Sequence, residues 1–450
     1  MLSDAQRRQE SVGLRLKVAL DGRLGTGKRN ILVIAGATGV GQLLAVISAP
    51  ILSRLFSPAD FGLLAVVLAV ALPLGSVSAL RFEAAIPIAE EERAAYSLVW
   101  LSLLAMLGSA LVTCCAIAVF GSSMARAMNV PRATPWLWVI PCIALLGGLI
   151  LVLNQLAIRH RRYPATGRRA ILQSATTVSG QLGSGAAQVG PGGLIIGYAV
   201  GQLVGALSLL RGSGMTSRLA MEGRSTSLLL ASAKRYRRFP AFLAPAGLLN
   251  AVGIQLPVLL LAVNFGSADA GWFGMTQRVV ALPAALIGLA VAQVYLGELA
   301  RVIRDNPDRA MRMFNRSTRT LALVGVSLAL VLLVFSPWAF PLVLGPEWAT
   351  SGLYAQAASI GLAAQIVASP LASTLTVLEH QKTQLVCDAA RVVGMIGAVT
   401  IVSRIGGSAL SAVWALTAVT TLFYAAYWAL SRRSLRNFLL ASEVPNEEGK

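Results

Sequence analysis

The sequence FSPADFG at residues 56–62 returns as FGSADAG at residues 265–271, with four of seven positions identical. Each copy is a short polar turn between two long apolar runs. A repeat at half-length in a very hydrophobic chain indicates a duplicated helical bundle, an arrangement common among transporters. We therefore expect two similar halves. In each half, Asp60 or Asp269 is expected to be the N-cap of the second membrane span.

The composition indicates a membrane protein. The 450 residues are 56% hydrophobic and 13% charged, whereas a soluble domain is roughly 45–50% apolar and 25% charged. The mean hydropathy is +0.70, and a spanning helix needs about 20 mostly apolar residues. Twelve runs meet this need: 31–53, 61–80, 96–119, 136–157, 171–189, 193–210, 240–264, 272–296, 320–344, 353–378, 384–403 and 408–430.

These runs predict an all-α polytopic membrane protein. We expect about twelve transmembrane helices in two six-helix lobes that are related by a pseudo-two-fold axis. The longest charged loop follows the sixth run and is the natural linker. The predicted parts are a cytoplasmic basic tail (1–30), an N-lobe (31–211), a cytoplasmic linker (212–238), a C-lobe (239–431) and a cytoplasmic tail (432–450).

The charge distribution predicts the orientation of the chain. If the N-terminus is cytoplasmic, 33 of the 38 Lys and Arg residues fall in inside segments, 4 fall in outside segments, and Arg278 lies within a span. This bias follows the positive-inside rule and places both termini in the cytoplasm. The net charge of +19 is explained by basic loops that face anionic lipids. Because the charge is spread over many short loops, we expect no nucleic-acid partner.

Residues for catalysis or metal binding are scarce. The chain has two histidines, His160 and His380, and four cysteines without metal-ligand spacing. No pair of carboxylates and no nucleophile with a base stands out, so we expect no enzyme, metal or cofactor. The segment Gly22–Lys28 resembles the start of a phosphate-binding loop, but Arg29 replaces the Ser or Thr that would hold magnesium.

A polar stripe follows the fifth run. Gln173, Thr177, Gln181, Ser184 and Gln188 are spaced four, four, three and four residues apart. This spacing puts all five on one helix face. The stripe either packs against another helix, aided by neighbouring glycines, or forms the wall of a polar passage. We favour the passage, because glutamine is bulky for a tight seam between helices.

Several charges lie within or beside predicted spans. Arg278 follows Gln277 near the start of the eighth run, and Arg81 and Glu83 end the second. An arginine in hydrocarbon costs roughly 2.5–3.5 kcal/mol, so it normally pairs or lines a cavity. For Arg278 we favour contact with cargo over a structural ion pair or snorkelling, because a guanidinium fork suits phosphate. Arg81 and Glu83 fit a helix-end anchor and a binding site equally well.

Asp388 and Arg391 are three residues apart at the start of the eleventh run. This spacing allows them to pair on one helix face. We favour a structural ion pair. The alternative is that Asp388 carries a coupling ion.

A set of short motifs occurs in a fixed order along the chain. The motifs are Ser53-Arg-Leu-Phe-Ser-Pro-Ala-Asp-Phe-Gly62, Leu80-Arg-Phe-Glu83, Tyr236-Arg-Arg-Phe-Pro240, Leu249-Asn250, Gln277-Arg278, Gly345-Pro-Glu-Trp348, Ser369-Pro370, and Leu378-Glu-His-Gln381 with Asp388 and Arg391. Each motif alone is weak, and the specificity lies in their order and spacing. Together they resemble bacterial polysaccharide-biosynthesis flippases of the Wzx type, over roughly residues 30–430, nearly the whole chain.

The resemblance implies membership of the multidrug/oligosaccharidyl-lipid/polysaccharide exporter superfamily. Its fold is two six-helix lobes around a central cavity. Wzx-type members flip undecaprenyl-diphosphate-linked oligosaccharides across the bacterial inner membrane by alternating access, for O-antigen (lipopolysaccharide), exopolysaccharide or capsule assembly. The family's cationic cavity residues map onto Arg81 and Arg278. The candidate cargo contacts are Arg278, Arg81, Glu83, Gln277, Gln173, Gln181, Gln188 and Asn250.

The expected partners follow from the same resemblance. They are the lipid-linked oligosaccharide, membrane lipids and, as candidate proteins, a polysaccharide polymerase and a chain-length regulator. The second hypothesis is a cation-coupled multidrug exporter of the same superfamily. Such exporters commonly carry an acidic residue deep in the N-lobe, and the first run here has none, which leaves Asp388 as the acid best placed for coupling. A glycan polymerase or ligase is disfavoured by the short outside loops.

Overall fold

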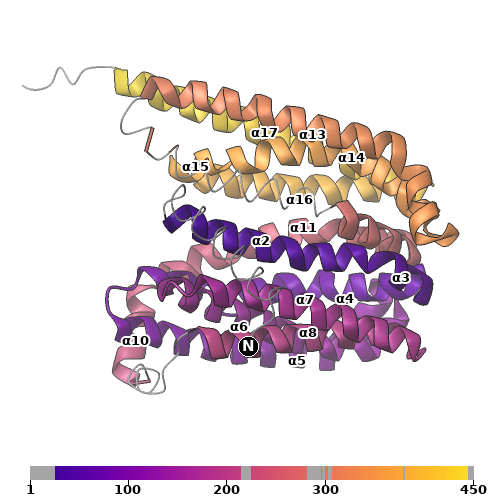
Figure 1. Ribbon diagram of the computed structural model, residues 1–450, viewed down its shortest axis with the longest axis horizontal. Coiled ribbons are helices and arrows are strands. Elements are labelled where there is room, and N and C mark those ends of the chain that lie inside the picture. The colour runs from indigo at the N-terminus through magenta and orange to yellow at the C-terminus, as the bar shows by residue number, and fades with distance from the viewer. Residues whose placement is uncertain are drawn as a thin grey trace, which may run out of the picture.

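The computed structural model describes residues 26–213, 224–280, 295, 299, 301–302, 307–378 and 381–443. Every regular element in these ranges is helical, so the predicted all-α fold is confirmed (Figure 1). The elements are α2 (Thr26–Ile47), α3 (Ala49–Leu55), α4 (Pro58–Val77), η1 (Phe82–Ile88), α5 (Glu92–Ala127), η2 (Pro131–Val139), α6 (Ile140–Arg159), α7 (Tyr163–Ala186), α8 (Pro191–Gly212), α10 (Thr226–Arg235), η3 (Phe239–Leu243), α11 (Ala244–Phe265), a helix over 267–280, α13 (Pro307–Leu344), η4 (Pro346–Trp348), α14 (Ala349–Leu371), α15 (Ser373–Val377), α16 (Gln381–Arg404) and α17 (Ala409–Glu443).

Ten helices within the described residues are long and apolar enough to cross a membrane. Two of the twelve predicted runs account for the difference. The fifth run coincides with α7, which is a helix but carries too many Gln, Ser and Thr residues to count by hydropathy. The eighth run continues from the helix over 267–280 into residues that lie outside the described part. The chain is therefore a multi-pass membrane protein.

Several helices extend past the apolar runs. Residues 1–25 of the predicted basic tail lie outside the described residues, but α2 already begins at Thr26. The predicted linker contains the short helix α10, and α17 continues through Glu443 into the predicted C-terminal tail. These extensions carry basic residues that are too polar for the hydrocarbon region. The lobe boundaries themselves stay a prediction.

The two halves of the chain meet along α11. Figure 1 shows α4, α5, α6 and α8 on one side and α13, α14, α16 and α17 on the other, with α2 and α11 between them. In the first half, α7 packs against α2 and α8; in the second, α14 packs against α13 and α17. Helix α11 contacts α4 of the first half and α16 of the second. It is therefore the main bridge between the halves.

The two copies of the repeated turn touch each other through their glycines. A Cβ atom on Gly271 would lie 2.8 Å from the backbone nitrogen of Gly62 and would overlap the carbonyl of Pro58. A Cβ atom on Gly62 would lie 2.6 Å from the carbonyl carbon of Ser267. Glycine is required at both positions because the backbones approach too closely for a side chain. The duplicated motif is thus a contact point between the halves.

The expected N-cap at Asp60 is wrong by three residues. Ser57 is the N-cap of α4, because its extended backbone precedes Pro58 at the first helical position. The Ser57 hydroxyl accepts a bond from the Asp60 backbone N–H at 3.3 Å. The Asp60 carboxylate accepts one from the Ser57 N–H at 3.0 Å, which completes a capping box. In the second copy, Asp269 also is the third helical residue, and it accepts a bond from the Tyr354 hydroxyl.

A set of contacts between the halves closes the end of the molecule that carries the turns, which we call the turn end. The fully buried Trp348 donates its indole N–H to the Ser53 carbonyl at 3.0 Å. The Ser53 hydroxyl donates to the Leu344 carbonyl at 2.7 Å. The ring of Phe61 meets Trp348 edge to face, with 5.3 Å between centroids. The Gly345-Pro-Glu-Trp348 motif therefore joins the second half to the first.

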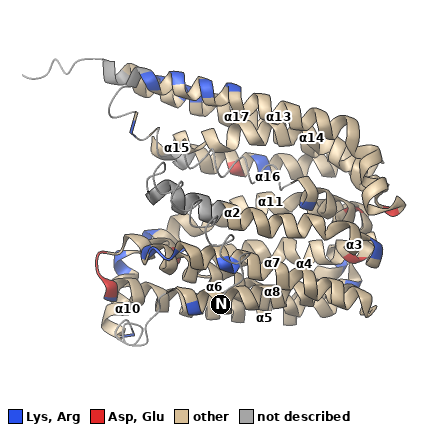
Figure 2. Ribbon diagram, in the orientation of Figure 1, with Lys and Arg blue, Asp and Glu red and all other residues tan. Residues whose placement is uncertain are grey.

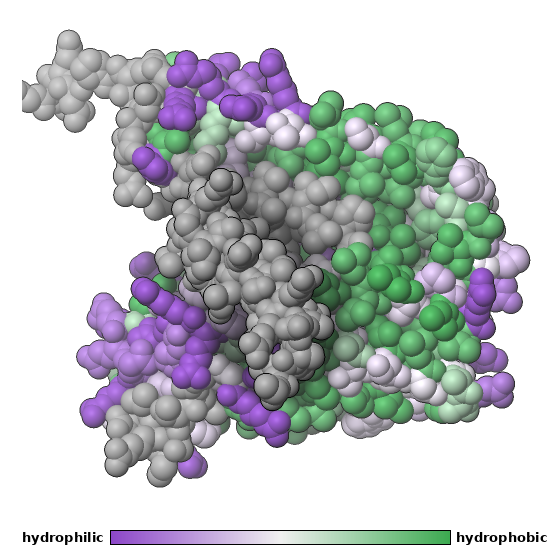
Figure 3. Space-filling view, in the orientation of Figure 1, coloured by the Kyte–Doolittle hydropathy of each residue, from purple (hydrophilic) through white to green (hydrophobic). Residues whose placement is uncertain are grey.

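Charge and hydropathy divide the molecule along its length. Figure 2 shows most Lys and Arg residues at the end that carries α10 and few at the turn end near α3. In Figure 3 the hydrophilic residues gather at the α10 end, and hydrophobic residues cover much of the rest of the visible face. This arrangement agrees with a chain that crosses the bilayer along its long axis. Which end is cytoplasmic stays a prediction.

Candidate functional site

A cavity of about 400 Å³ lies between α4, α7, α11 and the helix over 267–280; we call it the first cavity. Its wall is largely apolar, with Phe61 and Leu68 among the lining residues. Polar side chains enter it from both halves of the chain: Gln173, Thr177, Gln181, Gln255, Gln277 and Arg278. Four of the predicted site residues therefore share one cavity.

Arg278 crosses from the second half of the chain to the first. Its Nε donates to the Ala45 carbonyl at 3.2 Å, and one Nη lies 3.5 Å from the Ser48 hydroxyl. Both partners are uncharged, and Arg278 forms no ion pair with a carboxylate of the described residues. A guanidinium has five donors, so donors remain for a ligand. The first cavity therefore carries a positive charge that the described residues do not neutralise.

The polar stripe of α7 both lines a cavity and packs against another helix, the two roles that the sequence left open. Gln173, Thr177 and Gln181 line the first cavity. On its flank, the same face packs against α8, and the Gln181 Nε2 donates to the Leu194 carbonyl at 3.0 Å. The Gln181 Oε1 is buried without a protein partner. The stripe is thus a cavity wall and a helix seam at once.

A row of glycines on α8 makes this seam possible. Gly193, Gly197, Gly201 and Gly205 recur every four residues and face α7. A Cβ on Gly201 would overlap the Thr177 hydroxyl, and one on Gly205 would lie 3.1 Å from the Cβ of Gln173. Small residues at this spacing let membrane helices approach closely. The sequence analysis missed this signal, although the period of four is visible in the sequence.

Arg169 is a second cation near the first cavity that the sequence analysis missed. Its Nη1 donates to the Oε1 of Gln173 at 2.7 Å, and its Nε is buried without a partner. Hydropathy places Arg169 outside the fifth apolar run, which begins at residue 171. Helix α7 begins earlier, at Tyr163, so Arg169 lies on the face of Gln173 one turn below it. The four-residue spacing was the available signal.

A second cavity, of about 720 Å³, lies between α11, the helix over 267–280, α14, α16 and α17. Gln255 and Gln277 line this cavity as well as the first one. The two cavities therefore meet at this pair of amides. Arg391 is the one charged side chain among the described residues that line the second cavity.

The predicted pairing of Asp388 with Arg391 is present. The Asp388 carboxylate lies 3.6 Å from an Nη of Arg391, and the Asn250 Oδ1 accepts from the same nitrogen at 3.4 Å. The guanidinium lies over the Phe423 ring at 4.9 Å and is 6% exposed. It reaches α11 at Gly253, where a Cβ would lie 2.6 Å from Nη2. Asn250 therefore belongs to the Arg391 cluster rather than to the first cavity.

The family described as polysaccharide biosynthesis protein matches residues 51–352. The chain belongs to this family. The succinoglycan biosynthesis transport protein ExoT of Rhizobium meliloti (strain 1021) is 24% identical over 319 residues, which is 68% of this chain and 60% of that protein. The chain thus spans about 60% of the length of that relative.

Solved structures with the same fold are transporters and flippases of the MOP superfamily. The lipid II flippase MurJ in an inward closed conformation matches with a TM-score of 0.69 and 12% identity, over 91% of this chain and 90% of MurJ. An inward-facing multidrug resistance transporter of the MATE family matches with a TM-score of 0.67 and 13% identity, over 92% and 96%. These similarities confirm the superfamily fold that the sequence resemblance implied.

Like Asn250, three further predicted site residues line neither cavity. Arg81 is 3.9 Å from the buried Glu83 and lies against α11, where a Cβ on Gly247 would be 2.7 Å from its Nε. Burial raises the pKa of the Glu83 carboxyl, although Arg81 opposes this shift. Gln188 was expected on the stripe, but α7 ends at Ala186, so the exposed Gln188 leaves that face. Cargo contact by these three residues stays a prediction.

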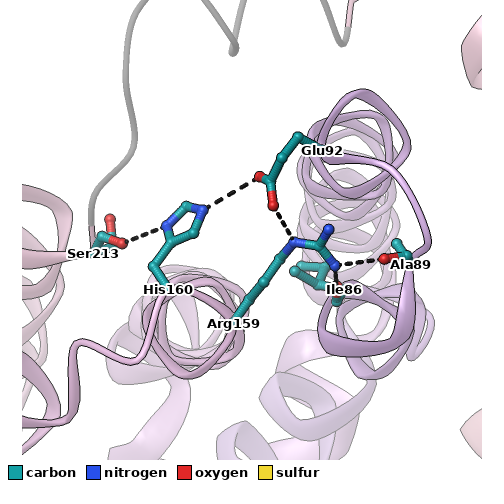
Figure 4. Close-up of polar contacts among 6 residues, drawn as sticks. All are labelled: Ile86, Ala89, Glu92, Arg159, His160 and Ser213. Carbon is teal, nitrogen blue, oxygen red and sulfur yellow. Dashed lines mark hydrogen bonds and ion pairs between the residues drawn. The ribbon is translucent and has the colours of Figure 1, made fainter.

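His160 takes part in a polar cluster at the α10 end (Figure 4). Its two ring nitrogens lie 3.4 Å from the Glu92 carboxylate and 3.1 Å from the Ser213 carbonyl. Arg159 donates to Glu92 at 2.9 Å and to the carbonyls of Ile86 and Ala89. The cluster ties η1, α5, α6 and the end of α8 together. It lines neither cavity, so we assign it to stability.

No group of three or more His, Cys, Asp or Glu side chains in the described ranges could hold a metal ion. All four cysteines are free, and three lie on α5 and α6. His380 lies outside the described residues. The geometry instead offers two cavities with amide, hydroxyl and guanidinium groups.

Proposed function

We propose that this chain flips an undecaprenyl-diphosphate-linked oligosaccharide from the inner to the outer leaflet of the bacterial inner membrane. The observation that carries the proposal is Arg278 in the first cavity, with two uncharged partners and no carboxylate among the described residues. A cation in this state selects an anionic ligand, and a guanidinium fork matches phosphate oxygens. The diphosphate of the cargo supplies that charge.

The other polar residues have roles around this contact. Arg169 holds Gln173 and adds a second positive charge on the side of the α10 end. Gln277 lies next to Arg278 in the sequence and lines both cavities, so it contacts the groups attached to the diphosphate. The prenyl chain stays in lipid, because neither cavity has room for a long hydrocarbon. Arg81 and Glu83 are proposed to meet cargo as it enters.

Alternating access requires that the turn end opens and closes. We propose that the turn end faces outward and that both termini are cytoplasmic, as the positive-inside rule predicts. The structure then represents a state closed to the outside, held by Trp348, Ser53 and the Gly62–Gly271 contact. Opening would break two hydrogen bonds and separate the lobes at this end. Rocking of two repeat-related lobes around a fixed site is a common transport mechanism.

The most suitable cargo is an exopolysaccharide repeat unit. The relative ExoT is named for succinoglycan, an exopolysaccharide, and not for O-antigen or lipopolysaccharide. We therefore propose exopolysaccharide assembly ahead of capsule or O-antigen assembly. A polysaccharide polymerase and a chain-length regulator are the proposed protein partners, because they act on a repeat unit after it reaches the outer leaflet.

The second candidate function is cation-coupled multidrug export. It is favoured by the fold similarity to MATE transporters and by Asp388, which lies beside the second cavity. Its ion pair with Arg391 argues against it, because a coupling acid must exchange its ion freely. An exporter of this kind would change drug susceptibility when deleted, whereas a flippase would change the surface polysaccharide.

Deletion and complementation test the proposed function. We expect loss of surface polysaccharide in a deletion strain, rescue by the wild-type gene, and no rescue by Arg278→Gln. The variant should insert normally, since an arginine in hydrocarbon costs roughly 2.5–3.5 kcal/mol and its removal eases insertion. Arg312→Gln, at an exposed arginine of α13, is the matched control and should rescue fully.

Two outcomes would count against the proposal. Normal polysaccharide levels with Arg278→Gln at wild-type membrane abundance would remove the role of this residue. Unchanged polysaccharide with altered drug susceptibility in the deletion strain would favour the exporter.

A further inference from the structure

The two cavities differ in charge. In the first cavity, the described residues leave Arg278 without a carboxylate partner. In the second, Asp388 lies 3.6 Å from Arg391 and offsets its charge. A buried pair of this kind attracts a free anion less than an isolated cation does. The second cavity is therefore a polar compartment with little net charge.

The lining of the second cavity is rich in neutral hydrogen-bonding groups. Helix α14 contributes Gln365 and Ser369, four residues apart on one face, and both are exposed. Helix α17 contributes Thr420 and Tyr424, also four residues apart. The Thr420 hydroxyl donates to the Leu416 carbonyl at 2.7 Å, so it offers its oxygen to a ligand as an acceptor. Exposed amides do not suit contact with lipid, so Gln365 faces the open space of the cavity. Such a surface offers donors and acceptors together, which is what uncharged sugar hydroxyls require.

The first cavity has less capacity for sugars. The two amides that line only this cavity already have protein partners: Gln173 accepts from Arg169, and Gln181 donates to the Leu194 carbonyl. Thr177 packs against Gly201 of α8. It also has about 400 Å³, compared with about 720 Å³ for the second. The larger space lies in the second cavity, and so does Gln365, for which the described residues provide no hydrogen-bond partner.

The two cavities are placed so that one molecule can occupy both. Gln255 and Gln277 line each of them, and Gln277 is adjacent to Arg278 in the sequence. A diphosphate held at Arg278 therefore lies at the border of the second cavity. The sugar attached to that diphosphate would continue past the two amides.

We propose that the second cavity is the glycan compartment of the transporter, which takes the first uncharged sugars of the cargo while the first cavity takes the diphosphate. This inference rests on the proposed function. It places sugar recognition on α14 and α17 rather than on the glutamines of the α7 stripe, which the family resemblance gave as candidate cargo contacts. Gln365 and Thr420 are the specificity-determining side chains.

Binding to the purified full-length chain in lipid nanodiscs tests this division. The probes are farnesyl diphosphate and farnesyl diphosphate-linked glucose. Since one net hydrogen bond contributes about 0.5–1.5 kcal/mol, the sugar should tighten wild-type binding by about threefold to tenfold. Gln365→Met and Thr420→Val should each reduce this sugar-dependent gain and leave farnesyl diphosphate binding unchanged. Arg278→Gln should weaken both probes.

Gln356→Met is the matched control. Gln356 is on the same helix, donates to the Leu333 carbonyl at 2.8 Å, and does not line the cavity. It should keep the full gain from the sugar. Monodisperse elution from a size-exclusion column establishes that each variant is folded. Because the two substitutions lie on different helices, α14 and α17, the test remains possible if one variant does not fold.

The remaining outcomes separate the two proposals. If wild type binds both probes equally, or if Gln365→Met and Thr420→Val keep the full gain, the glycan compartment is wrong. If Arg278→Gln leaves both affinities unchanged while the α14 and α17 variants lose the gain, the compartment stands and the phosphate role of Arg278 fails. If wild type binds neither probe, both proposals fail.

Discussion

At the scale of single residues, a position in a cavity could be predicted for Arg278. An arginine inside an apolar run costs free energy unless it pairs or lines a cavity. The partners of Arg278 were not predictable, since Ala45 and Ser48 are more than 200 residues away and only packing brings them together. Arg169 was missed for a different reason. Hydropathy marks where the chain becomes apolar, whereas helix α7 begins about two turns earlier, at Tyr163. A polar residue in that first stretch can still face a cavity.

Glu83 provides a pH-dependent prediction. Burial raises its pKa above 4.5, its ordinary value, so the folded state binds the proton more tightly than the unfolded state does. The stabilisation is fully present below the unfolded pKa and is lost as the pH rises through the folded pKa. Thermal unfolding in detergent should therefore show a falling melting temperature as the pH rises from 4. Glu83→Gln should reduce that slope.

The control for this prediction is Glu90→Gln, because Glu90 is an exposed carboxylate that pairs with Arg235. It should keep the wild-type slope. An unchanged slope in Glu83→Gln would show that another group titrates in this range.

At the scale of elements, the sequence predicted helices well and their ends poorly. Ten of the twelve runs correspond to described helices that could cross a membrane. Helix α7 fell short on hydropathy because its Gln and Thr side chains face a cavity and a helix seam rather than lipid. Helices α13 and α17 run past the apolar segments, since a helix needs no hydrocarbon around it to continue. Capping chemistry, and not hydropathy, sets ends such as Ser57.

The α7–α8 seam gives a prediction at this scale. Gly201→Val should destabilise the protein by about 1–3 kcal/mol, because the added side chain must displace Thr177 in a packed seam. A lower melting temperature in detergent measures this loss. The double variant Gly201→Ala with Thr177→Ala should recover part of it, since the overlapping hydroxyl is gone.

Gly183→Val is a suitable comparison on α7, because a Cβ there meets nothing within 4 Å. It should change stability little. If the substitutions at positions 201 and 183 lower the melting temperature equally, the close approach of α7 and α8 at Gly201 would be contradicted.

At the scale of the whole molecule, the repeated turn predicted two similar halves, and the structure adds a contact between the two copies. The sequence suggested two matching corners, whereas the structure brings Gly62 and Gly271 into contact. No local pattern can report such a contact, because it depends on how the halves pack. The same holds for the two cavities, which form where α11 meets helices from both halves.

The molecule has a closed turn end and two adjacent cavities that share lining residues. Trp348 and Ser53 hold the closed end, and Gln255 and Gln277 separate the cavities. Cargo transfer across the membrane should therefore depend on the charge at Arg278 and on the opening of the turn end. The first of these two requirements can be measured without knowledge of the natural sugar.

Transbilayer movement in proteoliposomes tests the central proposal most directly. The probe is a fluorescent short-chain prenyl diphosphate-linked glucose, and dithionite added outside destroys only the fluorophores in the outer leaflet. Wild-type protein should allow quenching well beyond the outer-leaflet fraction, whereas Arg278→Gln should match empty liposomes. Wild-type quenching equal to that of empty liposomes, or full activity in Arg278→Gln, would contradict the account.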